Sequence, residues 1–226
     1  MIVDCISDLH GEWPFLKGGA DLLIIAGDLC ATNTEKEYDD FWRWMLYQPH
    51  EYVVIIGGNH DNFLQENPDF FPNSGGQFSY LCDSGCEING MKIWGSPWTK
   101  TFEGMNPKCK AFTVDSDEEL AEKWEMIPYD TDILITHCPP WGILDKTRRG
   151  EHVGSKSLFS IVYQINPKAI FYGHIHECGL KFTTENDILF VNCSILNEYY
   201  DNRNSYIRCQ IQNSSFMGCV IQEQKM

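Results

Sequence analysis

Short apolar runs in this chain are repeatedly followed by side chains that can bind a metal ion. The runs are rich in Ile, Val, Leu and Phe, as is typical of strands buried on both faces. They are residues 1–7, 22–26, 53–57, 133–136, 169–172 and 188–192. Helical apolar spacing or helix boundary signals lie between them, at residues 34–47, 116–126 and 155–164. Strands alternating with helices predict a layered α/β fold.

The middle and the end of the sequence indicate antiparallel pairing as well. Residues 78–81 and 87–94 are expected to form antiparallel strands, with Asn89-Gly90 as a hairpin turn. Residues 205–212 and 215–222 have the pattern of a second hairpin. We therefore predict mixed sheets in a sandwich rather than a plain doubly wound sheet. The length of 226 residues fits a single domain over residues 1–226.

Charge and hydropathy exclude several kinds of partner. The chain has 32 acidic and 17 basic side chains and a formal net charge of -15. Proteins that bind a nucleic-acid backbone present a basic face, so no nucleic-acid partner is expected. No apolar stretch approaches the roughly 20 residues that span a bilayer, and residues 1–6 are too short and too soon polar for a signal peptide. We expect a cytoplasmic protein without membrane contact, with its ten cysteines reduced and packed as small apolar side chains.

The side chains that follow the predicted strands form a set of oxygen and imidazole donors. They are Asp8, His10, Asp28, Asn59, His60, Asp61, His137, His174 and His176. Ligands of open α/β sheets bind outside the carboxyl ends of the strands, where these residues are expected to gather. Five of the seven histidines lie in these motifs, so chance is a poor explanation of the pattern. The sequence therefore predicts a dinuclear metal site.

The chemistry of phosphoryl transfer explains these residue types. Two divalent cations about 3.5–4 Å apart can hold both the attacking and the leaving oxygen. Cations that close need a negatively charged bridge, for which the carboxylate of Asp28 is suited. Side chains at positions i and i+2 of an extended segment point the same way, so Asp8 pairs with His10, and His174 with His176.

The ordered motif set closely resembles the calcineurin-like metallophosphoesterase signature, over most of the chain from Asp8 to His176. This resemblance implies a four-layer αββα sandwich with mixed sheets. One metal would be held by Asp8, His10, Asp28 and His176, and the other by Asp28, Asn59, His137 and His174. His60 would give a proton to the leaving group, and Asp61 would orient His60. The alternative for Asp61 is that it caps a loop.

A narrower resemblance rests on residues 137–145, residues 95–99, and Asn192-Cys193-Ser194 with Asn197. These segments look like the metallophosphoesterase-domain-containing subfamily, which is similar to class III cyclic-nucleotide phosphodiesterases. The resemblance implies a phosphodiesterase of small esters such as cyclic nucleotides, acting through a metal-bridging hydroxide. Two Mn ions are expected, with Fe, Zn, Co or Ni as alternatives. Gly27-Asp28-Leu29-Cys30 lacks the Asp-Arg-Gly continuation of the protein phosphatases in the family.

Alternative functions and substrate contacts remain open at this point. A phosphomonoesterase, a nuclease of the same fold and a metal-bound scaffold without activity are the alternatives. Trp98 and Trp141 are candidates for stacking on a small-molecule substrate, with plain packing as the alternative. Arg148 and Arg149 are candidates for contact with a phosphate group, with a solvated charged loop as the alternative. The sequence does not indicate an oligomeric state.

Overall fold

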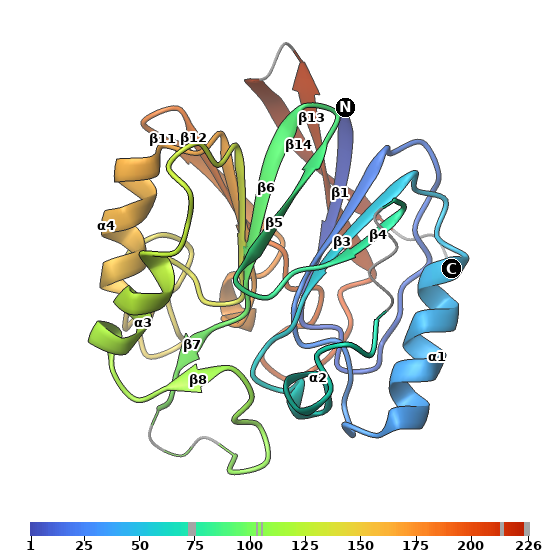
Figure 1. Cartoon of the computed structure of the whole chain (residues 1–226), viewed down its shortest axis with the longest axis horizontal. Helices are drawn as coiled ribbons and strands as arrows, with labels where there is room; N and C mark the ends of the chain where they lie inside the picture. Colours follow the sequence, from blue (N-terminus) through green and yellow to red (C-terminus); the bar gives the residue numbers. More distant parts are fainter. Residues whose placement is uncertain (72–75, 103, 105, 213–214, 224–226) are drawn as a thin grey trace.

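The computed structural model describes residues 1–71, 76–102, 104, 106–212 and 215–223. Two six-stranded sheets lie face to face in the molecule (Figure 1). The first sheet has the order β14 (Ser215–Glu223), β13 (Ser205–Gln212), β1 (Ile2–Ile6), β2 (Leu22–Ala26), β3 (Tyr52–Ile56) and β4 (Phe78–Tyr80). The second has the order β11 (Lys181–Glu185), β12 (Ile188–Asn192), β10 (Ala169–Tyr172), β9 (Ile133–Thr136), β6 (Met91–Ser96) and β5 (Ser84–Ile88). A small parallel sheet joins β7 (Thr99–Lys100) to β8 (Thr113–Val114).

Helices flank the paired sheets. They are α1 (Glu35–Leu46), α2 (Asn62–Glu66), α3 (Asp117–Trp124), α4 (Lys156–Ile165) and the short 3₁₀ helix η1 (His176–Cys178). The three longer helices begin after Thr34, Ser116 and Ser155, whose side chains accept a backbone N–H of the first turn. In Figure 1, α1 lies beside the first sheet, and α3 and α4 lie together beside the second. The structure confirms the four-layer αββα sandwich with mixed sheets.

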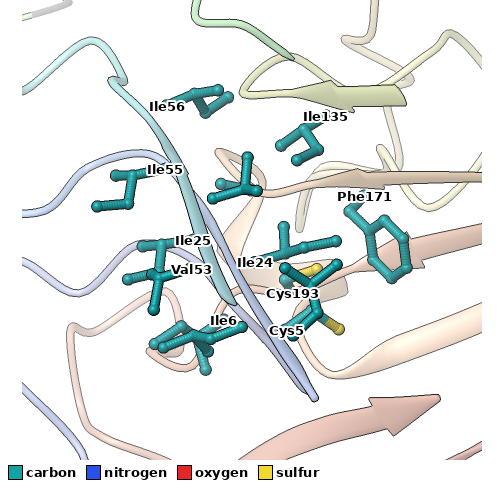
Figure 2. Packing of buried hydrophobic residues seen from close by; sticks show 14 of the residues in the cluster. Cys5, Ile6, Ile24, Ile25, Val53, Ile55, Ile56, Ile135, Phe171 and Cys193 are labelled. Carbon is teal, nitrogen blue, oxygen red and sulfur yellow. The ribbon is translucent and has the colours of Figure 1, made fainter. Parts of the chain in front are cut away.

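The continuous apolar runs form strands because both of their faces are buried. In the second sheet, Ile133, Ile135 and Phe171 belong to the core cluster that includes the first sheet. Their neighbours Leu134 and Ile170 point the other way and pack with residues of α3 and α4. Figure 2 shows Cys5 and Ile24 of the first sheet close to Phe171 of the second sheet and to Cys193, which follows β12.

One expected strand pairing is wrong. β5 and β6 do form an antiparallel hairpin, and Asn89 and Gly90 have the positive φ angles of 52° and 76° that its tight turn needs. Residues 78–80, however, pair in parallel with β3 in the first sheet. The chain passes from the first sheet to the second between β4 and β5, so these neighbouring strands do not pair with each other.

The terminal hairpin corrects the expectation for two cysteines. β13 and β14 pair antiparallel as predicted, and the connecting residues 213–214 lie outside the described part. Cys209 and Cys219 stand opposite each other in this pairing and form a disulfide, so they are not reduced packing residues. The other eight cysteines are free, and six of them are buried. Among the described residues, no helix has the length and apolar character of a bilayer span.

Candidate metal centre

The candidate ligands lie where the two sheets meet. β1, β2 and β3 run parallel in the first sheet, and β9 and β10 run parallel in the second, so their carboxyl ends are grouped within each sheet. The end of β1 joins the second sheet through Ser7, whose backbone N–H donates to Cys193 (3.0 Å) and whose carbonyl accepts from Ile195 (3.0 Å). This junction brings residues that are far apart in the sequence to one place.

Several candidate ligands have an unusual backbone conformation. Asp8, His10, Asp28 and His174 have φ angles of 55°, 43°, 56° and 67°. Residues other than glycine rarely adopt this left-handed region, which costs on the order of 1–3 kcal/mol per residue and is concentrated at functional sites. Backbone hydrogen bonds hold the turns, because the N–H groups of Leu9 and His10 both donate to the carbonyl of Asp28.

Two glycines lie directly against the carboxylates. A Cβ atom at Gly58 would overlap the side chain of Asp28, and one at Gly173 would overlap the side chains of Ser7 and Asp8. Only glycine therefore allows the backbone to approach this closely. The glycines of the strand-end motifs are explained by the packing of the site.

A first group of ligand atoms comes from Asp8, His10 and His176, whose metal-binding atoms lie within 4.8 Å of one another. Oδ1 of Asp8 is 3.3 Å from Nε2 of His176. Nε2 of His10 is buried and has no hydrogen-bond partner among the described residues, and Oδ2 of Asp28 is 3.6 Å away. A buried nitrogen without a partner is costly, and a cation at this position would satisfy it.

A second group comes from Asp8, Asp28 and His137, again within 4.8 Å. Nε2 of His137 lies 3.3 Å from Oδ2 of Asp28 and 3.2 Å from Oδ1 of Asn59. Its other nitrogen, Nδ1, lies 2.9 Å from the carbonyl of Ala26. Such a carbonyl contact fixes the ring and directs Nε2 to a metal. Asp8 belongs to both groups. Oδ2 of Asp28 lies between them, 3.6 Å from Nε2 of His10 and 3.3 Å from Nε2 of His137.

His174 lies beside these groups. Its ring centroid is 5.0 Å from that of His137, and its backbone N–H donates to both oxygens of Asp8 (3.0 Å each). Burial and the neighbouring charge of His137 lower the pKa of His174 to about 3. Its ring is therefore neutral, as a metal ligand must be.

Electrostatics keep the two carboxylates of the site ionised. Burial favours the neutral acid, but the charge and hydrogen bond of His176 together with the charge of His137 outweigh it and lower the pKa of Asp8 below its ordinary value. The pKa of Asp28 is lowered in the same way, against the effect of burial, chiefly by His137. Both acids are buried. A divalent cation would meet two negative oxygens that need no deprotonation.

The remaining imidazole of the cluster belongs to His60. A metal-binding atom of His60 lies within 4.8 Å of those of His10 and Asp28. Its backbone N–H donates to Oδ1 of Asp28 (2.8 Å), and its ring meets the His10 ring edge-on at 4.5 Å. Among the described residues its side chain has no hydrogen-bond partner. The imidazole of His60 is therefore available to a substrate.

The structure corrects the expected contact of Asp61. Its carboxylate accepts hydrogen bonds from the N–H groups of Gly58 (2.7 Å) and Leu29 (3.1 Å) and from the hydroxyl of Tyr38 (2.7 Å). Within the described chain, none of its hydrogen bonds reaches the ring of His60. Burial and the charge of Asp28 raise the pKa of Asp61 to about 7. The geometry favours the loop-cap alternative, in which Asp61 fixes the loop that carries Asn59 and His60.

The candidate substrate contacts lie in different surroundings. The indole N–H of Trp98 donates to Asp83 (2.7 Å), and the ammonium of Lys123 lies 4.0 Å from its ring centroid, so Trp98 has a packing role. Trp141 is exposed and lies 5.6 Å from the ring of His152. Arg148 and Arg149 are exposed on the loop that follows.

Two groups that sequence patterns do not single out also touch the site. The half-exposed ring of Tyr200 lies 5.0 Å from that of His10 and 5.1 Å from that of His176. The guanidinium of Arg203 donates to the carbonyls of His176 (2.8 Å) and Gly179 (2.9 Å). For Tyr200, the aromatic run Tyr199-Tyr200 close to Asn197 is the sequence signal that could have identified it. No sequence signal identifies Arg203, because its partners are backbone atoms of another segment.

Comparison with known proteins gives a family. The family described as calcineurin-like phosphoesterase matches residues 1–178. Metallophosphoesterase domain-containing protein 1 of Homo sapiens is 32% identical over 222 residues, covering 87% of this chain and 66% of that protein. UPF0046 protein T07D4.2 of Caenorhabditis elegans is 31% identical over 232 residues, covering 88% of this chain and 57% of that protein. The chain thus spans somewhat less than two thirds of the length of these relatives.

Solved structures give the same fold at low sequence identity. TT1561 of Thermus thermophilus has a TM-score of 0.64 and 14% identity, with 98% of both chains covered. A 5'-nucleotidase precursor from the same organism has a TM-score of 0.53 and 11% identity, covering all of this chain and 54% of that one. These similarities concern the arrangement of the sheets and helices.

Proposed function

This chain belongs to the calcineurin-like phosphoesterase family, and from that premise we propose that it is a metal-dependent phosphodiesterase of small phosphate esters such as cyclic nucleotides. The observation that carries the proposal is the convergence of three overlapping ligand groups, with Nε2 of His10 buried and unpartnered among them. The donor set of carboxylate, imidazole and amide oxygen fits two divalent cations, with Mn as the expected metal.

The ligand set of the proposal is the one that the family resemblance implies, and five of its seven residues belong to the groups described above. Asp8, His10, Asp28 and His176 would hold one cation, and Asp28, Asn59, His137 and His174 the other. Bound there, the cations would act as Lewis acids on the phosphate oxygens and bring the pKa of a bound water toward neutrality.

The chain's own residues perform the remaining chemistry in this proposal. His60 donates a proton to the departing ester oxygen, because its ring lies at the edge of the ligand cluster and its side chain is free of hydrogen bonds within the described structure. Asp61 fixes the loop beneath His60 through the two backbone N–H groups that it accepts. No covalent intermediate with the protein is needed.

A chromogenic assay tests the proposal. Bis-p-nitrophenyl phosphate, p-nitrophenyl phosphate and cyclic AMP are each incubated with the purified chain, with Mn²⁺ or with EDTA. We expect turnover that requires Mn²⁺ and is faster for the diester than for the monoester. Faster monoester turnover would make the protein a phosphomonoesterase. A metal-loaded protein without turnover of any of the three would support the non-catalytic scaffold.

A further inference from the structure

A cationic loop follows the metal-ligand candidate His137 in this acidic protein. Residues 146–156 contain four basic side chains, Lys146, Arg148, Arg149 and Lys156, and only one acidic side chain, Glu151. The chain as a whole has the opposite balance, with 32 acidic and 17 basic side chains. The loop therefore concentrates positive charge in one segment.

Among the described residues, the two arginines of this loop differ from the other three arginines of the chain because no ion pair engages them. Ion pairs engage Lys36, Arg43, Lys92, Lys168, Arg203 and Arg208. In the described part of the chain, none of the four loop cations forms an ion pair. The ammonium of Lys156 lies 5.8 Å from the ring centroid of Trp141. A cation without an ion pair can bind an anion without first breaking its contact with a carboxylate.

A buried carboxylate fixes the loop. Asp145 is fully buried, and its Oδ2 accepts the backbone N–H groups of Gly142 (3.0 Å) and Gly154 (2.9 Å). Its Oδ1 lies 2.5 Å from Nδ1 of His152, whose ring is partly exposed. One side chain thus ties together both ends of the segment that carries the cations. The loop is organised in advance, which lowers the entropic cost of binding.

Contacts place Arg148 beside the segment that carries His176. Its backbone N–H donates to Glu177 (3.1 Å), the residue after His176. Its guanidinium lies 4.7 Å from the ring centroid of Tyr199. The adjacent residue Tyr200 contacts the rings of His10 and His176. The Tyr199-Tyr200 turn therefore connects the metal centre to Arg148.

We propose that Arg148, with Arg149 beside it, binds a second phosphate group of the substrate at the rim of the metal centre. This inference rests on the proposed function and adds a preference, among small phosphodiesters, for those that carry a further phosphate. A guanidinium presents its donors in a planar fork that matches phosphate oxygens. Contact with the Tyr199 ring restricts the guanidinium beside the site and leaves its donors free of carboxylates.

Two dinucleotides that differ by one phosphate group test the inference. Hydrolysis of adenylyl-adenosine and of its 5′-phosphorylated form is followed by chromatography with the Mn²⁺-loaded chain. We expect the wild-type kcat/KM to be about tenfold higher for the phosphorylated form, and the ratio to fall to nearly one in Arg148→Gln, because a charge-assisted contact is lost. Arg43→Gln removes the same charge from an ion pair on α1 and should keep the wild-type ratio.

Two outcomes separate this inference from the proposed function. The second phosphate site is wrong if bis-p-nitrophenyl phosphate is hydrolysed but the two dinucleotides have equal kcat/KM. It is also wrong if Arg148→Gln keeps the wild-type ratio of the two kcat/KM values. In both cases the proposed phosphodiesterase activity is still supported. If neither dinucleotide is hydrolysed, both are titrated into the Zn²⁺-loaded chain and followed by amide NMR. Shifts at Arg148 and Arg149 with the phosphorylated form alone, absent in Arg148→Gln, support the site, and equal or absent shifts overturn it.

Discussion

At the scale of single residues, two neighbouring histidines of the site have opposite protonation. The ring centroids of His137 and His174 lie 5.0 Å apart. His137 is buried and His174 is partly buried. Burial disfavours the charge on His137, but the carboxylates of Asp28 and Asp8 outweigh it and raise its pKa to about 9. His174, beside that charge, has a pKa of about 3. Without metal, a proton on His137 therefore offsets part of the carboxylate charge.

Metal binding should consequently release protons at neutral pH. A ligand imidazole must be neutral, so at pH 7 a cation must displace the proton of His137, and below its pKa the affinity should rise up to about tenfold per pH unit. We expect Mn²⁺ to bind more tightly at pH 8.5 than at pH 7, with proton release that shrinks above pH 9. Calorimetry in buffers of different ionisation enthalpy measures both quantities. Equal affinity and no proton release across this range would contradict the assigned protonation.

At the scale of elements, the sequence predicts well what local chemistry determines. Residues 133–136 and 169–172 form strands because their apolar runs are covered on both faces. Ser116 begins α3 with a reciprocal capping box to Glu119. The strand-end motifs predicted polar side chains that the structure brings together in possible ligand groups, such as Asp8, Asp28 and His137, because the direction of parallel strands places their carboxyl ends together.

Features that depend on long-range contacts could not be predicted. β4 pairs in parallel with β3 and does not pair with β5, the next strand in the sequence, because β5 belongs to the other sheet. The partners of Asp61 are backbone N–H groups and a helix tyrosine, which no motif encodes. The Cys209–Cys219 disulfide depends on the register of β13 and β14. In each case the sequence shows the residue, and only the fold shows its partner.

The short helix η1 provides a prediction at this scale. Arg203 holds η1 through the carbonyls of His176 and Gly179, so Arg203→Met should free the segment that orients His176. We expect the Mn²⁺ Kd to rise by roughly tenfold or more, as is typical when a group that positions a ligand is lost. Competition with a fluorescent chelator measures the Kd, and Arg43→Met serves as the control. A folded Arg203→Met protein with wild-type affinity would show that η1 needs no such support.

At the scale of the whole molecule, the candidate metal centre joins the two sheets. Asp8, His10, Asp28 and Asn59 follow strands of the first sheet, and His137, His174 and His176 follow strands of the second. A cation bound by both sets would link the halves of the sandwich. Metal binding should therefore stabilise the entire fold.

Thermal unfolding measures this linkage. At a Mn²⁺ concentration about a thousandfold above Kd, a single bound ion stabilises the folded chain by about 4 kcal/mol. For a chain of this size the unfolding midpoint would rise by roughly 8–16 °C. Asp28→Asn keeps the shape of the side chain but lacks the charge, and should show little of this increase. An equal rise in Asp28→Asn would place the stabilising metal elsewhere.

The central claim is that the ligand cluster hydrolyses phosphodiesters with His60 as proton donor. The most direct measurement is bis-p-nitrophenyl phosphate turnover by His60→Ala, made on protein whose metal content has been determined. We predict two metal ions per chain, as in the wild type, with turnover lowered at least a hundredfold, the lower end of the range for general acid catalysis. Asp28→Ala, in contrast, should lose metal. Full turnover in His60→Ala, or loss of metal equal to that in Asp28→Ala, would contradict the account.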